Sequence, residues 1–382
     1  MKRLPLLLLL AALASCGGGG GDGGGTGPVT PPPTATIKAT TQPVQLSNPW
    51  GMAMLPDGSW LVTQRTGSLV RVAADYASSQ PVSGAPAVDS AGQGGLLDVA
   101  LDPDFATSPY VYLSYSEPGV GAEAGKSGTA VARAQLVGNA LQGLTVIFRQ
   151  APKVSGSGHY GSRLVFRGDK TLFITLGERQ LGSPAQDLAQ TLGKVVRINR
   201  DGSAPADNPA FGIGARVGLW SLGHRNPQGA ALHPTTGELW VSEHGSQGGD
   251  EINISRAGAN YGWPTVSYGC NYGDPVGTAC AIGGGTHAPR FVEPLTYWVP
   301  TSTAPSGIAF YSGAMFAEWQ GNLFVGALAG QALWRLTLSG NTVTAKEALF
   351  ANLGERIRAV KPATDGALLL LTDSGKLIRI AR

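Results

Sequence analysis

The sequence is poor in charged residues and in cysteine. Lys, Arg, Asp and Glu make up 14% of its 382 residues, the formal net charge is +3, and no cluster of Lys and Arg is interleaved with aromatic residues. Because a nucleic-acid surface requires such a basic patch, the composition argues against nucleic acid as a partner. The three cysteines lack the spacing of zinc ligands, and no Gly-x-Gly-x-x-Gly sequence opens a strand-to-helix unit. These absences argue against a zinc site and a nicotinamide cofactor.

The apolar run near the N-terminus is too short to cross a bilayer in the mature protein. It extends from Leu4 to Leu13 and follows two positive charges, Lys2 and Arg3. This arrangement is typical of a secretory signal peptide, which we assign to residues 1–16. We therefore expect the protein to be exported.

The predicted signal peptide ends in Leu13-Ala14-Ser15-Cys16, which resembles the bacterial lipobox, whose cysteine becomes the lipid-modified first residue of the mature chain. Gly17 follows where aspartate would favour the inner membrane, so the resemblance indicates a lipid anchor in the outer membrane, on the periplasmic side. An ordinary signal peptide followed by an incidental cysteine is the alternative. Residues 17–36 are rich in Gly, Thr and Pro, so we expect a flexible tether there and a folded domain over 37–382.

Abundant glycine and short apolar segments indicate an all-β protein. The sequence contains 56 glycines, and segments rich in Val, Leu, Ile and Thr alternate with turn residues. One pattern recurs six times: an apolar segment, a turn built on Pro, Asp or Gly, a second apolar segment, and often a third that ends in Arg. The repeats begin at Gly51, Leu96, Arg163, Gln228, Ser306 and Ile357. Starts roughly 45 to 80 residues apart match one blade with variable loops, so we predict a six-bladed β-propeller of four-stranded antiparallel blades.

The most unusual chemistry lies between Leu219 and Pro264. His224, Arg225 and Asn226 come together at the end of an apolar segment, directly before a proline. A second apolar segment leads into a glycine-rich acidic loop over 243–251, which can direct carbonyl and carboxylate oxygens at a hard cation such as Ca²⁺. From spacing alone, hydrogen-bonded loop supports explain these residues equally well.

Three motifs in this region, GHRNPQG at 223–229, SEHGSQGGDEIN at 242–253 and NYGWP at 260–264, resemble the signature of the soluble quinoprotein glucose/sorbosone dehydrogenase family, and more closely its aldose sugar dehydrogenase branch. The similarity covers nearly all of the chain after the leader. It implies a propeller enzyme that uses pyrroloquinoline quinone (PQQ) and Ca²⁺ to oxidise the C1 hydroxyl of aldose sugars to lactones, with a cytochrome, quinone or dye as external electron acceptor. The alternatives are a propeller that only binds sugars or proteins, and a calcium-dependent propeller lactonase.

The resemblance also assigns catalytic residues. His159, which glycines flank closely, matches the general base, and an imidazole suits this role because its ordinary pKa lies near neutrality. Arg225 would face the reactive carbonyl of the cofactor, with Asn226 beside it, and Gln93 would contact the cofactor. By themselves, His159 is as readily a structural histidine and Gln93 an ordinary turn residue. His224 is the second candidate for the base.

A pair of arginines and an aromatic residue complete the predicted cofactor site. Arg356 and Arg358 are two positions apart, so in an extended strand their side chains point to the same side. The resemblance implies that they bind the PQQ carboxylates by charge-assisted hydrogen bonds; a solvated strand face is the alternative. Trp298 lies where the family places aromatic rings over cofactor and sugar, although a half-buried blade edge explains it equally well.

The resemblance implies two calcium sites. Backbone oxygens of Gly245 and Ser246 would hold the ion that polarises the quinone carbonyl, whereas Glu251 and Tyr261 would hold a further, structural calcium. Ser246 departs from the proline that is usual in the family, but its carbonyl oxygen remains available.

Other positions refine the prediction. Ala329 stands where glucose-specific members carry a lysine, which favours the broader aldose branch, and Glu178 replaces a commoner aspartate. After the leader only Cys270 and Cys280 remain, an even pair in an exported protein, so we expect a loop-closing disulfide. For the oligomeric state, a monomer and a homodimer are both compatible with the sequence.

Overall fold

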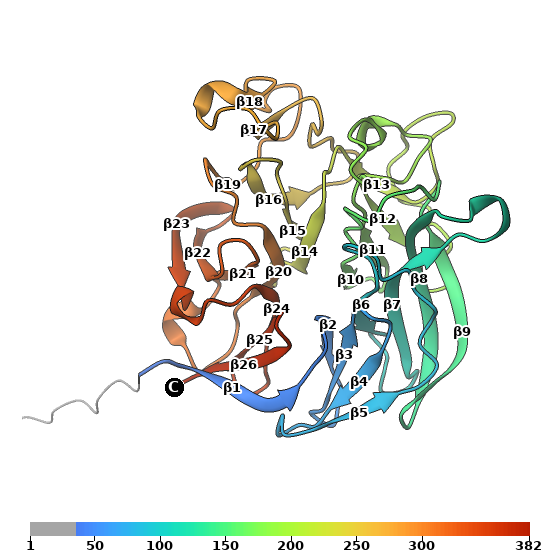
Figure 1. Ribbon diagram of the computed structural model, residues 1–382, viewed down its shortest axis with the longest axis vertical. Coiled ribbons are helices and arrows are strands. Elements are labelled where there is room, and N and C mark those ends of the chain that lie inside the picture. The colour runs from blue at the N-terminus through green and yellow to red at the C-terminus, as the bar shows by residue number, and fades with distance from the viewer. Residues whose placement is uncertain (1–35) are drawn as a thin grey trace, which may run out of the picture. The chain divides into compact units, whose positions relative to one another are not determined.

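The computed structural model describes residues 36–382, so the predicted signal peptide, its Cys16 and nearly all of the predicted tether lie outside the described residues. The described chain forms six four-stranded antiparallel sheets and one two-stranded sheet. The first strands of the six larger sheets lie side by side around a central axis, and each sheet extends outward as a blade (Figure 1). The predicted six-bladed β-propeller is confirmed.

All six predicted repeat starts lie at or next to the innermost strand of a blade. Blades 1 to 3 consist, from the axis outward, of β2 (Pro49–Met54), β3 (Trp60–Gln64), β4 (Leu69–Val72) and β5 (Ser79–Val82); β6 (Leu96–Leu101), β7 (Tyr110–Pro118), β8 (Ser127–Val137) and β9 (Ala140–Arg149); and β10 (Leu164–Phe166), β11 (Leu172–Thr175), β12 (Lys194–Ile198) and β13 (Leu219–Leu222). Blades 4 to 6 consist of β14 (Pro227–Leu232), β15 (Leu239–Glu243), β16 (Asp250–Ser255) and β19 (Thr296–Trp298); β20 (Pro305–Phe310), β21 (Leu323–Ala327), β22 (Leu333–Ser339) and β23 (Thr342–Leu349); and β24 (Ile357–Pro362), β25 (Leu368–Thr372), β26 (Lys376–Ala381) and β1 (Lys38–Gln45).

The remaining elements are short. β17 (Ser267–Cys270) and β18 (Ala281–Ile282) form a hairpin in the long connection between β16 and β19. Helical structure in the described residues is limited to 3₁₀ turns at Gly121–Glu123, Ser183–Gln186, Thr278–Cys280, Ala317–Trp319 and Ala351–Leu353. Within residues 36–382, no helix has the length and apolar character needed to cross a membrane.

The first strand of the chain closes the ring of blades. β1 pairs with β26, so it forms the outermost strand of blade 6, with Lys38 opposite Ala381 and Thr41 opposite Ile378. One sheet therefore contains both ends of the folded chain, and this pairing covers the edge that β26 would otherwise expose. The repeat pattern does not predict this strand, because β1 is mostly exposed and carries no apolar run.

The hydrophobic core lies between the faces of neighbouring blades. The second strand of five blades is buried at every position, as in the LLLLT sequence of β25. Because both faces of such a strand are covered, its sequence is a continuous apolar run rather than an alternation. This burial on both faces explains why the sequence repeats are so apolar.

Buried hydroxyl groups connect most blades to the next one. Each donates a hydrogen bond to a backbone carbonyl oxygen at the start of the following blade, and four of the five come from the blade's second strand. The donor and acceptor pairs are Thr63 and Leu97, Ser114 and Ser162, Thr175 and Pro227, Ser242 and Ser306, and Ser306 and Ile357. These bonds fix each of these blades relative to the start of the next blade.

Five of the six innermost strands also contain a β-bulge close to their first residue. The register shifts lie between Pro49 and Met52, Leu96 and Val99, Pro227 and Gly229, Pro305 and Ile308, and Ile357 and Ala359. A bulge turns side chains out of the regular alternation of a strand, and bulges occur often beside active sites. Trp50, Asp98, Gln228 and Arg358 lie within these bulges, and all four are buried at the propeller axis, in the contacts given below.

Candidate functional site

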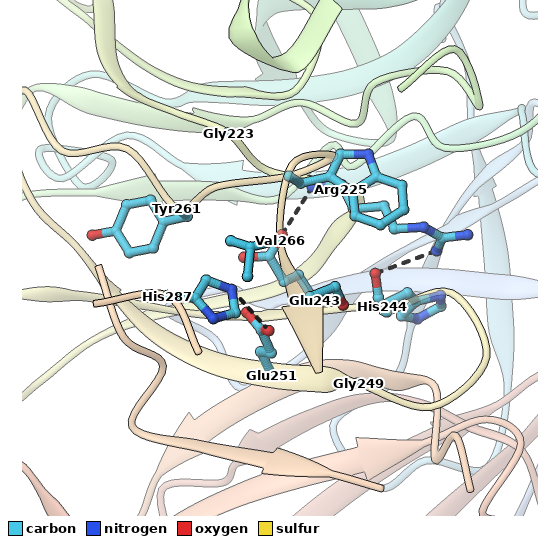
Figure 2. A pocket seen from close by; sticks show the side chains of 12 residues that line it. Gly223, Arg225, Glu243, His244, Gly249, Glu251, Tyr261, Val266 and His287 are labelled. Carbon is cyan, nitrogen blue, oxygen red and sulfur yellow. Dashed lines mark hydrogen bonds and ion pairs between the residues drawn. The ribbon is translucent and has the colours of Figure 1, made fainter. Parts of the chain in front are cut away.

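Two cavities share His244 near the bulged ends of the innermost strands. The first, here called the arginine pocket, has a volume of about 290 Å³ and is lined by Trp50, Arg65, Gln93, Gln228, His244, Ala304, Leu328, Arg356, Arg358 and Asp373. The second, called the carboxylate cavity, has a volume of about 20 Å³ and is lined by Gly223, Arg225, Glu243, His244, Gly245, Gly249, Glu251, Tyr261, Trp263, Val266, Ser267 and His287 (Figure 2). The first has the size of a small-molecule site, whereas the second has room for about one ion or water molecule.

The arginine pocket is positively charged. It contains three arginines and a single carboxylate, Asp373. Sequence reasoning missed Arg65, which follows β3 outside any recognised motif; its Nε donates to the carbonyl oxygen of Gly94 at 3.1 Å. Burial and the charge of Arg358 lower the pKa of Arg65, as expected for cations held close together. Such a pocket favours a ligand with several negative charges.

Arg356 and Arg358 share Asp373 as their partner. Arg358 donates from Nε and Nη2 to the two carboxylate oxygens, at 2.8 and 3.1 Å, and Nε of Arg356 donates at 3.0 Å. Their side chains thus face the same side, as their spacing predicts. The Arg358 side chain is 7% exposed and that of Arg356 is 48% exposed, so the alternative of a solvated strand face applies to Arg356 alone.

One ring nitrogen of His159 contacts a buried carboxylate. Nδ1 lies 2.6 Å from Oε1 of Glu178, and the backbone N–H of His159 donates to the side chain of Gln93 at 2.8 Å. An ionised carboxylate only accepts hydrogen bonds, so Nδ1 carries the proton and Nε2 is left with a lone pair. Nε2 has no hydrogen-bond partner among the described residues. The backbone of His159 is left-handed, with φ of 50°, a costly conformation that occurs often at functional sites.

The surroundings of His159 favour the neutral form of its imidazole. Burial lowers the pKa of its imidazole, and the positive charge of Arg225 lowers it further, whereas Glu178 opposes this shift. Glu178 and Arg225 are also joined through the backbone, because the N–H of Glu178 donates to the carbonyl oxygen of Arg225 at 2.9 Å. The structure therefore brings Gln93, His159 and Arg225 together and keeps the imidazole in the form that accepts a proton.

Arg225 and Asn226 have buried donors without partners. Nη1 of Arg225 donates to the carbonyl oxygen of His244 at 3.3 Å (Figure 2). Nη2 donates to the hydroxyl of Tyr272 at 3.2 Å. Nε of Arg225 and Nδ2 of Asn226 are buried and have no partner among residues 36–382. Because an unsatisfied buried donor is costly, these two groups fit a site that a polar ligand completes.

Three of the four predicted calcium ligands line a single cavity. Gly245, Glu251 and Tyr261 all line the carboxylate cavity, whereas Ser246 does not. Burial raises the pKa of Glu251 well above its ordinary value, and the nearby charge of Glu243 adds to this effect. A cation in this cavity would offset both effects. No group of three or more His, Cys, Asp or Glu side chains suited to a metal ion is found in the described part of the chain.

The loop after β15 holds two free carbonyl oxygens. The N–H of Gly245 donates to Oδ1 of Asp250 at 2.9 Å, and a Cβ atom at Gly245 would lie 2.2 Å from the carbonyl oxygen of Gly248, so only glycine fits there. The carbonyl oxygens of Gly245 and Ser246 accept no hydrogen bond from the described residues. They are therefore available to a ligand, as the family resemblance implies.

Trp298 is not brought to the site. It lies in β19, the outermost strand of blade 4, and its ring packs against Trp334 with centroids 5.7 Å apart. It lines neither cavity, because an outermost strand is remote from the axis, and the alternative of a blade-edge residue describes its position better. A further aromatic residue, Tyr272, contacts Arg225 and lies in the loop that the expected Cys270–Cys280 disulfide closes. Sequence reasoning missed Tyr272, and its place beside the first cysteine was the available signal.

Comparisons with known proteins agree with this architecture. The family model for glucose/sorbosone dehydrogenase matches residues 46–379. The aldose sugar dehydrogenase YliI of Escherichia coli (strain K12) is 43% identical over 353 residues, which cover 91% of this chain and 93% of that protein. The crystal structure of the soluble aldose sugar dehydrogenase (Asd) from Escherichia coli in the apo-form has a TM-score of 0.84 at 41% identity and covers 91% of this chain and 99% of that one. The PQQ-bound aldose sugar dehydrogenase (Adh) of Streptomyces coelicolor has a TM-score of 0.73 at 29% identity, with coverage of 92% and 99%.

Proposed function

The chain belongs to the glucose/sorbosone dehydrogenase family, and on this premise we propose that it is an exported, PQQ-dependent aldose sugar dehydrogenase that oxidises the C1 hydroxyl of aldoses to lactones. Its membership makes it an oxidoreductase of the sugar dehydrogenase type. The observation that carries the proposal is His159, a neutral imidazole with a free Nε2, placed beside Arg225 and a pocket for a polyanion.

The arginine pocket fits PQQ. PQQ carries three carboxylates, and Arg65, Arg356 and Arg358 line the pocket as possible partners. The unpartnered buried donors of Arg225 and Asn226 suit the polar oxygens of a quinone. When bound, PQQ supplies a quinone carbonyl carbon that accepts a hydride from the sugar. The PQQ-bound relative from Streptomyces coelicolor supports this assignment.

His159 would act as the general base. Loss of hydride from C1 requires the C1 hydroxyl to give up its proton, and Nε2 of His159 is free to take it. Glu178 would keep Nδ1–H in place and stabilise the imidazolium that forms. Arg225 carries a permanent positive charge, which would stabilise negative charge that grows next to it during hydride transfer.

Calcium is the second proposed cofactor. The free carbonyl oxygens of Gly245 and Ser246, the carboxylate of Glu251 and the carbonyl oxygen of Tyr261 are the hard oxygen donors that Ca²⁺ prefers. Gly245, Glu251 and Tyr261 line one cavity with room for about one ion. Glu251 and Glu243 are both buried there, so a divalent cation would compensate their charge.

Export and the electron acceptor are also proposals. The signal-peptide pattern and Cys16 support a protein on the periplasmic side, attached to the outer membrane only by a lipid anchor. The Cys270–Cys280 disulfide fits an oxidising compartment. A cytochrome, a quinone or, in the test tube, a dye would accept the electrons, and the protein would work as a monomer or a homodimer.

A dye-reduction assay tests the function. Purified protein mixed with PQQ and Ca²⁺ should reduce a dye such as dichlorophenolindophenol when an aldose is added, and the lactone should accumulate in proportion to reduced dye. The same protein without PQQ should be inactive. Protein that binds PQQ but reduces no dye with any aldose of a broad panel would contradict the proposal. Lactone hydrolysis without PQQ would instead identify a lactonase.

A further inference from the structure

One guanidinium group, that of Arg163, lies on the propeller axis and joins residues of five blades. Arg163 directly precedes β10 in blade 3, and its side chain is 5% exposed. Its contacts in four other blades are Trp50, Asp98, Gln228 and Arg358, in blades 1, 2, 4 and 6. In blade 5, a Cβ atom added to Gly307 would lie 3.2 Å from Nη2 of Arg163. Each of these residues lies at or inside the bulge of an innermost strand. The bulges therefore bring residues of several blades to one side chain.

The contacts of Arg163 use every nitrogen of its guanidinium. Nε donates to the carbonyl oxygen of Gln228 at 2.7 Å, Nη1 to Oδ1 of Asp98 at 3.2 Å, and Nη2 to the carbonyl oxygen of Arg358 at 2.9 Å. The carbon at the centre of the group lies 3.9 Å from the ring centroid of Trp50. The planar fork of arginine matches such divergent acceptors, which a lysine could not reach together.

Arg163 lies between the arginine pocket and a second, apolar chamber on the axis. The apolar chamber, of about 480 Å³, is lined mostly by the later residues of the same innermost strands, including Met52, Val99, Val165, Ala230, Ile308 and Lys361. Along β2 the lining changes from Trp50 in the arginine pocket to Met52 in the apolar chamber, and along β14 it changes from Gln228 to Ala230. The acceptors of Arg163 fall at this change, so its guanidinium lies directly beneath the floor of the arginine pocket.

Two residues of the arginine pocket depend directly on this guanidinium. Arg163 holds the backbone of Gln228 and Arg358, and the side chains of these two residues are joined above it, with Nη1 of Arg358 2.7 Å from Oε1 of Gln228. Stability alone does not explain a buried arginine here, because apolar residues of similar volume often replace buried ion pairs without loss. Asp98 is its one ion-pair partner within the described residues, and its side chain is 7% exposed.

We propose that Arg163 is a positioning residue for cofactor binding, which fixes Gln228 and Arg358 through their backbone carbonyl groups so that Arg358 can bind an anionic ligand. The inference rests on the proposed use of PQQ. Without the guanidinium, the carbonyl oxygens of Gln228 and Arg358 lose their donors and the floor of the pocket relaxes. Affinity for PQQ then falls although no atom of Arg163 lines the pocket.

The test is direct titration of the apo-protein with PQQ in the presence of Ca²⁺, followed by protein fluorescence. The main variant is Arg163→Met combined with Asp98→Asn, which removes the ion pair without leaving an unpaired charge and keeps the acceptor for the N–H of Leu164. We expect its Kd for PQQ to rise about tenfold or more, the effect of losing one charge-assisted hydrogen bond. Arg163→Lys should give an intermediate rise.

Arg197→Met is the matched control. Arg197 is also buried in blade 3, lies 5.5 Å from an aromatic ring centroid and pairs with carboxylates, but it lies in β12, away from the axis. It should leave the Kd within about threefold of the parent. A folded double variant with the parent's Kd would overturn the inference, and if that variant does not fold, an unchanged Kd in Arg163→Lys would do so. Failure of the parent protein to bind PQQ would instead contradict the proposed function.

Discussion

Two histidine–glutamate pairs occupy corresponding places in blades 3 and 4, but only one is free to act on a substrate. His159 and His224 each follow a glycine just before an innermost strand, and each directs Nδ1 at Oε1 of a glutamate 19 residues later, at 2.6 and 3.1 Å. The pairs differ at Nε2. That of His224 lies 2.8 Å from the hydroxyl of Ser221, whereas that of His159 has no partner among the described residues.

Blades 3 and 4 each supply an imidazole whose orientation is fixed by a glutamate. In both blades Nδ1–H of the histidine donates to the glutamate carboxylate, so both rings have the same tautomer. His224 is fully buried, and its ring is stacked on Tyr261 with centroids 4.6 Å apart. Its second nitrogen accepts from Ser221 and cannot also accept from a sugar. The environment of Nε2, rather than the histidine–glutamate pair, thus distinguishes a base from a structural support.

Replacement of the free histidine should have the largest effect. His159→Gln keeps the size and some hydrogen bonding of the side chain but removes the base, so we expect kcat to fall by about 10²- to 10⁴-fold. The Kd for PQQ should change little, because the arginine pocket does not include His159. Turnover of aldose with protein saturated in PQQ and Ca²⁺ measures this effect. A variant that retained parental turnover would show that His159 is not the base.

Replacement of Arg356 or Arg358 should affect cofactor binding rather than proton transfer. Arg358→Ala should raise the Kd for PQQ about tenfold or more, because it removes a buried cation that lines the pocket. It should also lower the free energy of unfolding, since Asp373 would keep only the exposed Arg356. Arg356→Ala should have the weaker effect on both quantities. PQQ titration together with thermal unfolding compares the two variants, and equal effects would contradict the structural ranking.

The pH dependence should sharpen the contrast further. A base must be deprotonated, and burial lowers the pKa of His159, so kcat/KM should rise with pH through a midpoint below about 6.5, the ordinary histidine value. Arg225 and Arg179 act in the same direction, and Glu178 acts against them. Glu178→Gln should therefore move this acidic limb to lower pH, while kcat also falls because ring orientation is less well fixed. A limb unmoved by Glu178→Gln would assign it to another group.

The architecture could be predicted because each blade repeats an apolar pattern that is buried locally. The six repeat starts coincide with the innermost strands for this reason. The closing strand β1 could not be predicted in this way, because its partner β26 lies at the other end of the chain and β1 itself is mostly exposed. Arg65 and Asp373, which line the arginine pocket from positions directly after β3 and β25, could not be predicted either, because no motif includes them.

The resemblance located His159, Arg225 and Gln93, and the structure brings these three together. It did not reveal that Arg356 and Arg358 share Asp373, because these ion pairs, 15 and 17 residues apart, belong to no motif that repeats elsewhere in the sequence. The histidine–glutamate pairs do leave such a trace: a Gly-His pair followed 19 residues later by Glu occurs in both blades 3 and 4. This internal repeat is visible in the sequence alone and groups each histidine with its glutamate.

Replacement of His224, the structural histidine, should have the smallest effect on activity. His224→Gln should lower the free energy of unfolding by about 1–3 kcal/mol, because Ser221 and Glu243 are buried and would lose well-placed partners. With PQQ and Ca²⁺ saturating, we expect kcat within about threefold of the parent, since Nε2 of His224 is already occupied. Ser221→Ala is the matched control, because it frees Nε2 without removing the ring. If His224→Gln lost turnover as His159→Gln should, while Ser221→Ala remained active, His224 would be the base and the roles of the two pairs would be reversed.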